Sequence, residues 1–287
     1  MNPPGRDLPI LDNHMHLDPS ALHLKAVQRF EKAGGTHIIV SHKPYDDLPV
    51  RNGEDYVAQF QRTLDMVGQA RANTHVKAYA TVGPYPVDYL YIQKTKGAAA
   101  AKVALMKGMD IAQGLVLEGK AIAIGEIGRP HFPVPAEVVQ ASNEIMQYGM
   151  QLAKEAGCPV VLHTESPAHP AHMLDILKMS RMVGLEDHKV VKHFSPANLA
   201  DPKLNHGATP SIIARQEAVV KALRFSNRFL METDYMDSLE RPDAVLPPEA
   251  IPELTKRLIE NGSLGHGDAD VIHRQLPTKV YGADFEI

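Results

Sequence analysis

The sequence is poor in the features that mark secreted or membrane-bound proteins. It has one cysteine, Cys158, in 287 residues, so no disulfide can form within the chain and nothing indicates an oxidising compartment. No apolar run approaches the roughly 18 residues that a membrane span needs. The first residues also lack the apolar stretch of a signal peptide. We therefore expect a cytoplasmic protein that does not enter a membrane.

Positive charge is scarce as well. The 30 lysines and arginines are outnumbered by 34 acidic residues, which gives a net charge of −4, so no general basic field would attract a long polyanion. The sequence has no Walker phosphate loop, no Gly-x-Gly-x-x-Gly turn after its first strand and no nucleophile-elbow serine. These absences argue against a Rossmann domain, a P-loop enzyme and a serine hydrolase.

What the chain does have is a regular alternation of short Val- and Ile-rich runs with helical patterns. The runs predict eight strands, at 9–16, 36–41, 76–82, 121–126, 159–163, 189–193, 206–213 and 228–234. Helices are expected between them, including one long helical stretch that ends near residue 117, and two more after the proline-rich stretch 242–252. Eight such units without a linker favour a single (β/α)8 barrel domain over residues 1–287, for which about 250 residues is typical.

Histidine is abundant, with 15 residues, and several of them lie where a predicted strand ends. Functional groups of a parallel barrel gather at the carboxyl ends of its strands. Five of the eight predicted strands end there in residues that bind metals, namely His14, His16, Glu126, His163, His193 and Asp234. A His-x-His pair alone is expected about once by chance at this histidine content, so the prediction of a metal site rests on the whole set.

The number of ligands indicates two metal ions. One catalytic zinc typically uses about three protein ligands, whereas two ions can share a bridging carboxylate and a water. We expect Glu126 to bridge, the two first-strand histidines to hold one ion with Asp234, and the fifth- and sixth-strand histidines to hold the other. Imidazole and carboxylate ligands suit Zn²⁺, Mn²⁺, Co²⁺ or Mg²⁺. Glu126 and Asp234 are thus the predicted catalytic residues, with Asp234 accepting the proton of the attacking water.

Around these residues the sequence resembles the TatD family of metal-dependent hydrolases. The matching segments follow the family's order and are Leu11–Asp18, Ile124–Gly128, Gln151–Ala153, Cys158–His163, Lys192–Ser195 and Met231–Asp234. The resemblance implies an amidohydrolase-like TIM barrel, two metals and hydrolysis of phosphodiester or related bonds, since several members are described as deoxyribonucleases. After Gly128, however, Arg-Pro-His-Phe replaces the family's usual Leu-Asp and aromatic residue, which indicates a divergent branch.

Two loops supply candidate substrate-binding residues. Arg129 and His131 follow the fourth strand, and His42 and Lys43 follow the second, beside Tyr45. The guanidinium of Arg129 suits anionic oxygens, although a loop-anchoring ion pair fits it equally well, and the second loop fits an ordinary surface loop. Phosphodiesters at nucleic-acid ends are the favoured substrates. An amidase or lactonase on the same barrel and a barrel without turnover remain alternatives.

The expected partners are therefore a small molecule or a short single-stranded nucleic acid, since the acidic chain offers little to a long duplex. Asp12 and Glu232 share strand parity with metal ligands, and we expect both to orient ligand imidazoles from the layer below, with a structural hydrogen-bond network as the alternative. Histidines away from the strand ends, such as His273, are expected at the surface. The sequence leaves the oligomeric state open.

Overall fold

A computed structural model describes residues 8–165 and 170–287, and a parallel sheet forms its centre. The strands are β1 (Leu11–His16), β2 (His37–Ser41), β3 (Lys77–Val82), β4 (Ala123–Gly128), β5 (Val160–His163), β6 (Val190–Ser195), β7 (Thr209–Ile213), β8 (Leu230–Glu232) and β9 (Tyr235–Met236). They lie in the order β8-β7-β6-β5-β4-β3-β2-β1-β9, and every pairing between them is parallel. The predicted parallel α/β architecture is thereby confirmed.

The two ends of this sheet meet in sequence, because only Thr233 and Asp234 separate β8 from β9. β9 pairs with β1, with Tyr235 opposite Met15. Between the two short strands, the amide of Asp234 donates to the carbonyl of His14 at 2.9 Å. The sheet therefore curls until the chain that leaves β8 lies against β1.

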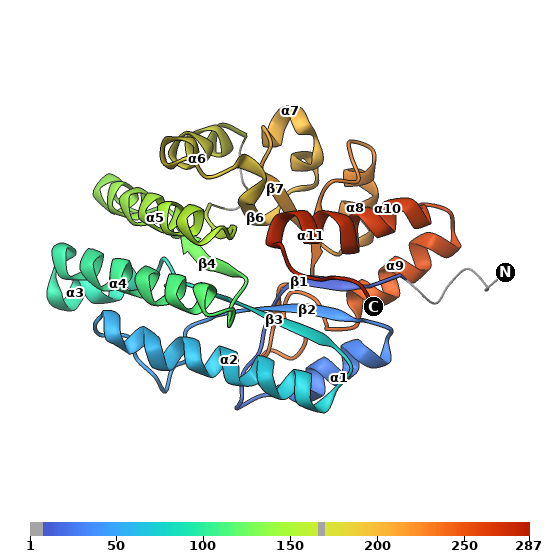
Figure 1. The fold of residues 1–287 in the computed structure, drawn as a ribbon, viewed down its shortest axis with the longest axis horizontal. Coiled ribbons are helices and arrows are strands. Elements are labelled where there is room, and N and C mark those ends of the chain that lie inside the picture. The colour runs from blue at the N-terminus through green and yellow to red at the C-terminus, as the bar shows by residue number, and fades with distance from the viewer. Residues whose placement is uncertain (1–7, 166–169) are drawn as a thin grey trace.

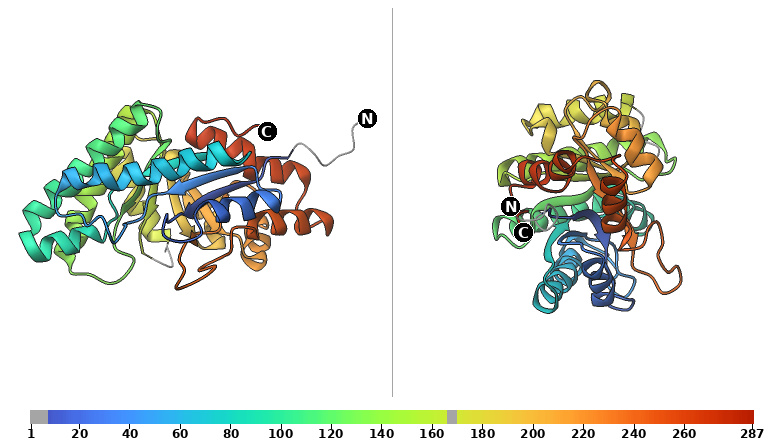
Figure 2. Two further views of the ribbon diagram at one scale, coloured as in Figure 1. Left: turned by 90° about the horizontal axis from the view of Figure 1, so that it is seen from below. Right: turned by 90° about the vertical axis from the view of Figure 1, so that its right-hand side faces the viewer.

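Helices surround the strands on the outside (Figures 1 and 2). They are α1 (Leu24–Lys32), α2 (Tyr56–Asn73), α3 (Asp88–Lys96), α4 (Ala98–Leu117), α5 (Ala136–Ala156), α6 (Pro170–Val183), α7 (Pro202–Asn205), α8 (Gln216–Leu223), α9 (Ala250–Glu260), α10 (His266–Asp270) and α11 (Leu276–Tyr281). None of the helices in the described ranges is long and apolar enough to cross a membrane.

Alternating side chains of the strands fill two apolar layers. Ile38 and Val40 of β2 pack outward in the largest cluster with helical side chains, whereas Ile39 points inward to residues of the other strands. The inward cluster also contains Val280 of α11 and Phe285. The carboxyl-terminal segment thus covers the amino ends of the strands, and the opposite end of the sheet is left for the site.

Most predicted elements are confirmed, including the weak seventh strand, and three details are corrected. The helical stretch that ends near residue 117 is two helices, α3 and α4, separated by Gly97, whose φ of +86° suits glycine. The last predicted strand is interrupted, as described above. His273 was expected at the surface but is fully buried, since its ring accepts the amide of Leu11 at 3.2 Å and contacts the hydroxyl of Thr255 at 3.1 Å.

Candidate metal centre

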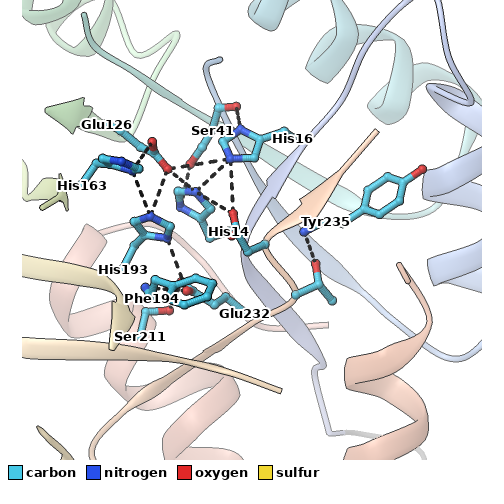
Figure 3. A network of polar contacts seen from close by, with 12 residues as sticks. His14, His16, Ser41, Glu126, His163, His193, Phe194, Ser211, Glu232 and Tyr235 are labelled. Carbon is cyan, nitrogen blue, oxygen red and sulfur yellow. Dashed lines mark hydrogen bonds and ion pairs between the residues drawn. The ribbon is translucent and has the colours of Figure 1, made fainter. Parts of the chain in front are cut away.

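The carboxyl ends of the strands bring the six predicted ligands together, and Figure 3 labels the four histidines and Glu126 among them. β1, β4, β5 and β6 supply five of them, and the sixth lies in the break between β8 and β9. These residues are His14, His16, Glu126, His163, His193 and Asp234. Parity along β1 is as predicted, because the Nε2 atoms of the first two histidines lie 3.3 Å apart.

One group of ligand atoms gathers around the first oxygen of Glu126. Nε2 of His14 lies 2.5 Å from Oε1 of Glu126, and Nε2 of His16 lies 3.8 Å from the same oxygen. Oδ1 of Asp234 is 3.4 Å from Nε2 of His16 and 3.8 Å from Nε2 of His14. Two imidazole nitrogens and two carboxylate oxygens therefore face one point.

A second group gathers around the other side of the same carboxylate. Nδ1 of His163 lies 3.3 Å from Oε2 of Glu126 and 3.3 Å from Nε2 of His193. Nε2 of His193 is also 3.6 Å from Oε1 of Glu126. Glu126 belongs to both groups, so two clusters of possible metal ligands adjoin each other at one carboxylate.

The chemistry of these atoms fits metal ions. Oε1 of Glu126 is buried and receives no hydrogen bond of acceptable geometry from the described residues. Burial would raise the pKa of Glu126, but the imidazoles of His193 and His14 outweigh it, so the pKa falls well below 4.5. A buried carboxylate that stays ionised among imidazole nitrogens is compensated well by a cation. The residues present therefore suit divalent metals with nitrogen and oxygen ligands.

Ser41 at the end of β2 fixes two of the rings. Nδ1 of His16 donates to the carbonyl of Ser41 at 2.9 Å, and because a carbonyl only accepts, Nε2 keeps its lone pair for a metal. Nδ1 of His14 lies 3.0 Å from the hydroxyl of Ser41. Ser41 was not singled out by the sequence, since a serine at a strand end gives no signal of its own.

Of the two acids expected below the metals, only Glu232 reaches an imidazole. It is fully buried, and its Oε1 lies 3.4 Å from Nδ1 of His193. Asp12 forms the structural network that was the alternative, because its carboxylate accepts the amides of His14 at 3.1 Å and Thr233 at 3.0 Å, and the Thr233 hydroxyl as well. Asp12 therefore holds the backbone of β1 to the break after β8, where regular strand pairing stops.

A cavity of about 570 Å³ opens over the site. Besides five of the six ligands, it is lined by residues of the surrounding loops, among them Lys43, Asp46, Tyr85, His131, Arg241 and Val245. Arg241 is exposed, and its guanidinium has no ion pair or hydrogen bond among the described residues. A cation without a counterion beside a metal centre suits an anionic group of a ligand.

The four predicted substrate-binding residues differ in their surroundings. Lys43 lines the cavity, with Nζ 2.6 Å from a carboxylate oxygen of Asp18. His131 lines the cavity too, whereas His42 is buried behind it, 3.2 Å from the Thr63 hydroxyl. Arg129 is also buried, and its guanidinium binds three side chains of the protein, those of Asn143, Glu165 and Asp175. Its geometry is that of the anchoring ion pair, the alternative left open by the sequence.

Comparisons with known proteins agree with this geometry. The model of the TatD related DNase family matches residues 11–282. An uncharacterized protein of Methanocaldococcus jannaschii is 37% identical over 287 residues, covering 98% of this chain and 99% of the relative.

Solved structures show the same fold at low sequence identity. A TatD family hydrolase from Entamoeba histolytica superimposes with a TM-score of 0.63 at 14% identity, covering 96% of this chain and 99% of that one. The phosphotriesterase homology protein of Escherichia coli, solved with phosphate in its active site, gives a TM-score of 0.63 at 14% identity and covers 96% and 100%. With a family match over nearly its whole length and a close relative of equal length, the chain belongs to the TatD related DNase family.

Proposed function

We propose that this protein is a hydrolase of phosphoester bonds that uses two divalent metals in a single (β/α)8 barrel domain. The observation that carries the proposal is the position of Glu126, whose two oxygens belong to two adjoining groups of imidazole nitrogens. His14, His16 and Asp234 would hold one metal, and His163 and His193 the other. When bound, such metals polarise the substrate and lower the pKa of a water molecule near neutrality.

The surroundings of the two acids suit different roles. Glu126 is fully enclosed, with 3% of its surface exposed, so it serves to hold the metals rather than to exchange protons with solvent. The side chain of Asp234 is 13% exposed and lines the cavity. Asp234 can therefore reach a proton released at the site and pass it to solvent, which is the role of a general base.

The cavity supports a small anionic substrate or a strand end. Its volume of about 570 Å³ lies within the range of roughly 300–1,000 Å³ that ligand pockets occupy. Arg241 lines it with a guanidinium that no described residue pairs with, and this group suits a phosphate oxygen. The net charge of −4 gives little affinity for long duplexes, which bind through many phosphate contacts. We therefore propose short single-stranded ends or small phosphoesters as substrates.

The test is a reconstitution assay. Metal-free protein is loaded in turn with Mg²⁺, Mn²⁺, Co²⁺ or Zn²⁺ and offered a model phosphodiester, short single-stranded oligonucleotides, a lactone and an amide. We expect metal-dependent cleavage of the phosphoesters that is lost in Glu126→Ala. Glu260→Ala is the matched control, since that exposed carboxylate lies at the end of α9 and does not line the cavity.

Two results would overturn the proposal. Turnover of the lactone or the amide alone would replace it with an amidohydrolase or lactonase acting through the same site. Cleavage that survives unchanged in Glu126→Ala would show that the reaction does not use this centre.

A further inference from the structure

We infer that His131 is a positioning residue that fixes the orientation of the metal ligand His163. Metal-binding histidines are generally oriented by a hydrogen-bond partner at the ring nitrogen that does not face the metal. Buried Ser41 contacts the outer nitrogens of His16 and His14, and Oε1 of buried Glu232 lies 3.4 Å from that of His193, at ion-pair distance but without hydrogen-bond geometry. His163 has neither kind of partner, and its outer nitrogen meets a second imidazole instead, that of His131 at the cavity rim.

The geometry assigns the protons of this pair. Nδ1 of His163 lies 3.3 Å from Oε2 of Glu126, so it is the nitrogen that faces the metals and carries no proton when one is bound. The proton of the neutral ring is then on Nε2, which lies 2.9 Å from Nδ1 of His131. His163 therefore donates and His131 accepts, which leaves the proton of His131 on its Nε2.

Tyr85 is the alternative partner, but its contact is weaker. Its hydroxyl lies 3.5 Å from Nε2 of His163, at the outer limit for a hydrogen bond, and its ring meets the imidazole edge-on with centroids 5.0 Å apart. Tyr85 thus packs against the ring, while the hydrogen bond of normal length belongs to His131.

The loop that carries His131 is built against His163. Gly128 has a φ of +137°, and a Cβ there would lie 2.2 Å from the carbonyl oxygen of His163. The next amide, that of Arg129, donates to the same carbonyl at 2.9 Å. The guanidinium of Arg129 then ties the loop to Glu165, at 3.1 Å, and to Asp175 on α6. The backbone that leads to His131 is therefore held at the residue whose ring it orients.

The loop and the ring are tied together by these contacts. Arg129 anchors the loop, and His131 follows two residues later. A phenylalanine ring in place of His131 would offer no acceptor for Nε2 of His163. The inference rests on the proposed function only in that His163 must bind a metal, and it is independent of the substrate.

The test measures metal binding rather than turnover. Metal-free wild type, His131→Phe, His131→Asn and Tyr85→Phe are titrated with Zn²⁺ and Co²⁺ by calorimetry, with ion content checked by elemental analysis. In His131→Phe we expect the affinity for one of two ions to fall 10- to 100-fold, the usual effect of losing such a partner. His131→Asn should stay within about threefold of wild type, because its side-chain oxygen replaces Nδ1 as acceptor. Tyr85→Phe should also match wild type.

Every outcome separates this inference from the proposed function. If His131→Phe binds each of the two ions as tightly as the wild type does, the role of His131 is overturned, whether or not the enzyme cleaves phosphoesters. A loss as large in Tyr85→Phe, or no rescue by His131→Asn, would overturn it as well. A wild type that binds two ions and loses one in His131→Phe, yet cleaves no phosphoester, would uphold the inference and refute the proposed function.

Discussion

Replacing Gly128 by alanine tests how closely the end of β4 is fitted to β5. Its φ of +137° is a conformation that residues with a Cβ rarely adopt, and the new methyl group would lie 2.2 Å from the carbonyl oxygen of His163. Backbone strain in such a sparsely populated region costs about 1–3 kcal/mol. The overlap also displaces a carbonyl that accepts the amide of Arg129 at 2.9 Å, and a buried hydrogen bond lost in this way costs about 1–3 kcal/mol. We expect Gly128→Ala to lower the free energy of unfolding by about 3 kcal/mol or more.

Gly157→Ala is the matched control for the strain alone. Gly157 ends α5 in the left-handed conformation, with φ 71° and ψ 15°, and a Cβ there would meet nothing within 4 Å. We expect Gly157→Ala to lower the free energy of unfolding by only about 1 kcal/mol. Urea unfolding of both metal-free variants gives the comparison, provided the slope of the transition is unchanged. Equal losses in the two variants would refute the reasoning, because they would show that the fit against His163 carries no cost.

Three further predictions concern charges. Burial raises the pKa of Asp88 to about 7, against the lowering effect of the Tyr56 hydroxyl, so the folded protein holds this proton more tightly than the unfolded chain does. As the pH rises from 4 to 7, the free energy of unfolding of the wild type should therefore fall by up to about 4 kcal/mol relative to that of Asp88→Asn. Urea unfolding at several pH values measures this, and the same pH dependence in both proteins would contradict it. Burial lowers the pKa of His14 but Glu126 outweighs it and raises the pKa to about 9, so metal uptake at pH 7 should release about one proton from this ring. Calorimetry in two buffers of different ionisation enthalpy checks this, and identical heats would exclude it. Arg241→Gln should raise KM for phosphoesters about tenfold or more, as expected for a lost charge-assisted hydrogen bond, and leave kcat and the fold unchanged; an unaltered KM would remove Arg241 from substrate binding.

The ligands of the centre could be predicted because they break a strong local pattern. A strand whose inward position holds Val191 should continue two residues later with another apolar residue, and His193 interrupts it where a parallel sheet exposes its functional end. The same reasoning holds for His163 after Val161. Periodicity and strand ends are local properties of a sequence, so local reasoning found them.

The residues that were missed depend on contacts between distant parts of the chain. Arg241 lies in an irregular loop, and only the fold shows that it faces the cavity. His273 is buried because Leu11 and Thr255 come to it from two other elements. Asp12 has the strand parity of an acid that orients a metal ligand. Its carboxylate instead accepts a hydrogen bond from the amide of Thr233 in the break after β8. These contacts join residues that are distant in the sequence, so no local spacing predicts them.

The interruption between β8 and β9 also has a consequence for how the protein is made. The candidate ligands begin at His14 in the first strand and end at Asp234 in that interruption, so for most of its synthesis a growing chain holds the two histidines of β1 without Asp234. The two histidines of β1 come close to Asp234 only when the neighbouring Thr233 has bound the carboxylate of Asp12. Cations that bind only the complete set of ligands stabilise the folded sheet over every partly folded form by mass action. Metal supply during translation should therefore govern the yield of folded protein as well as its activity.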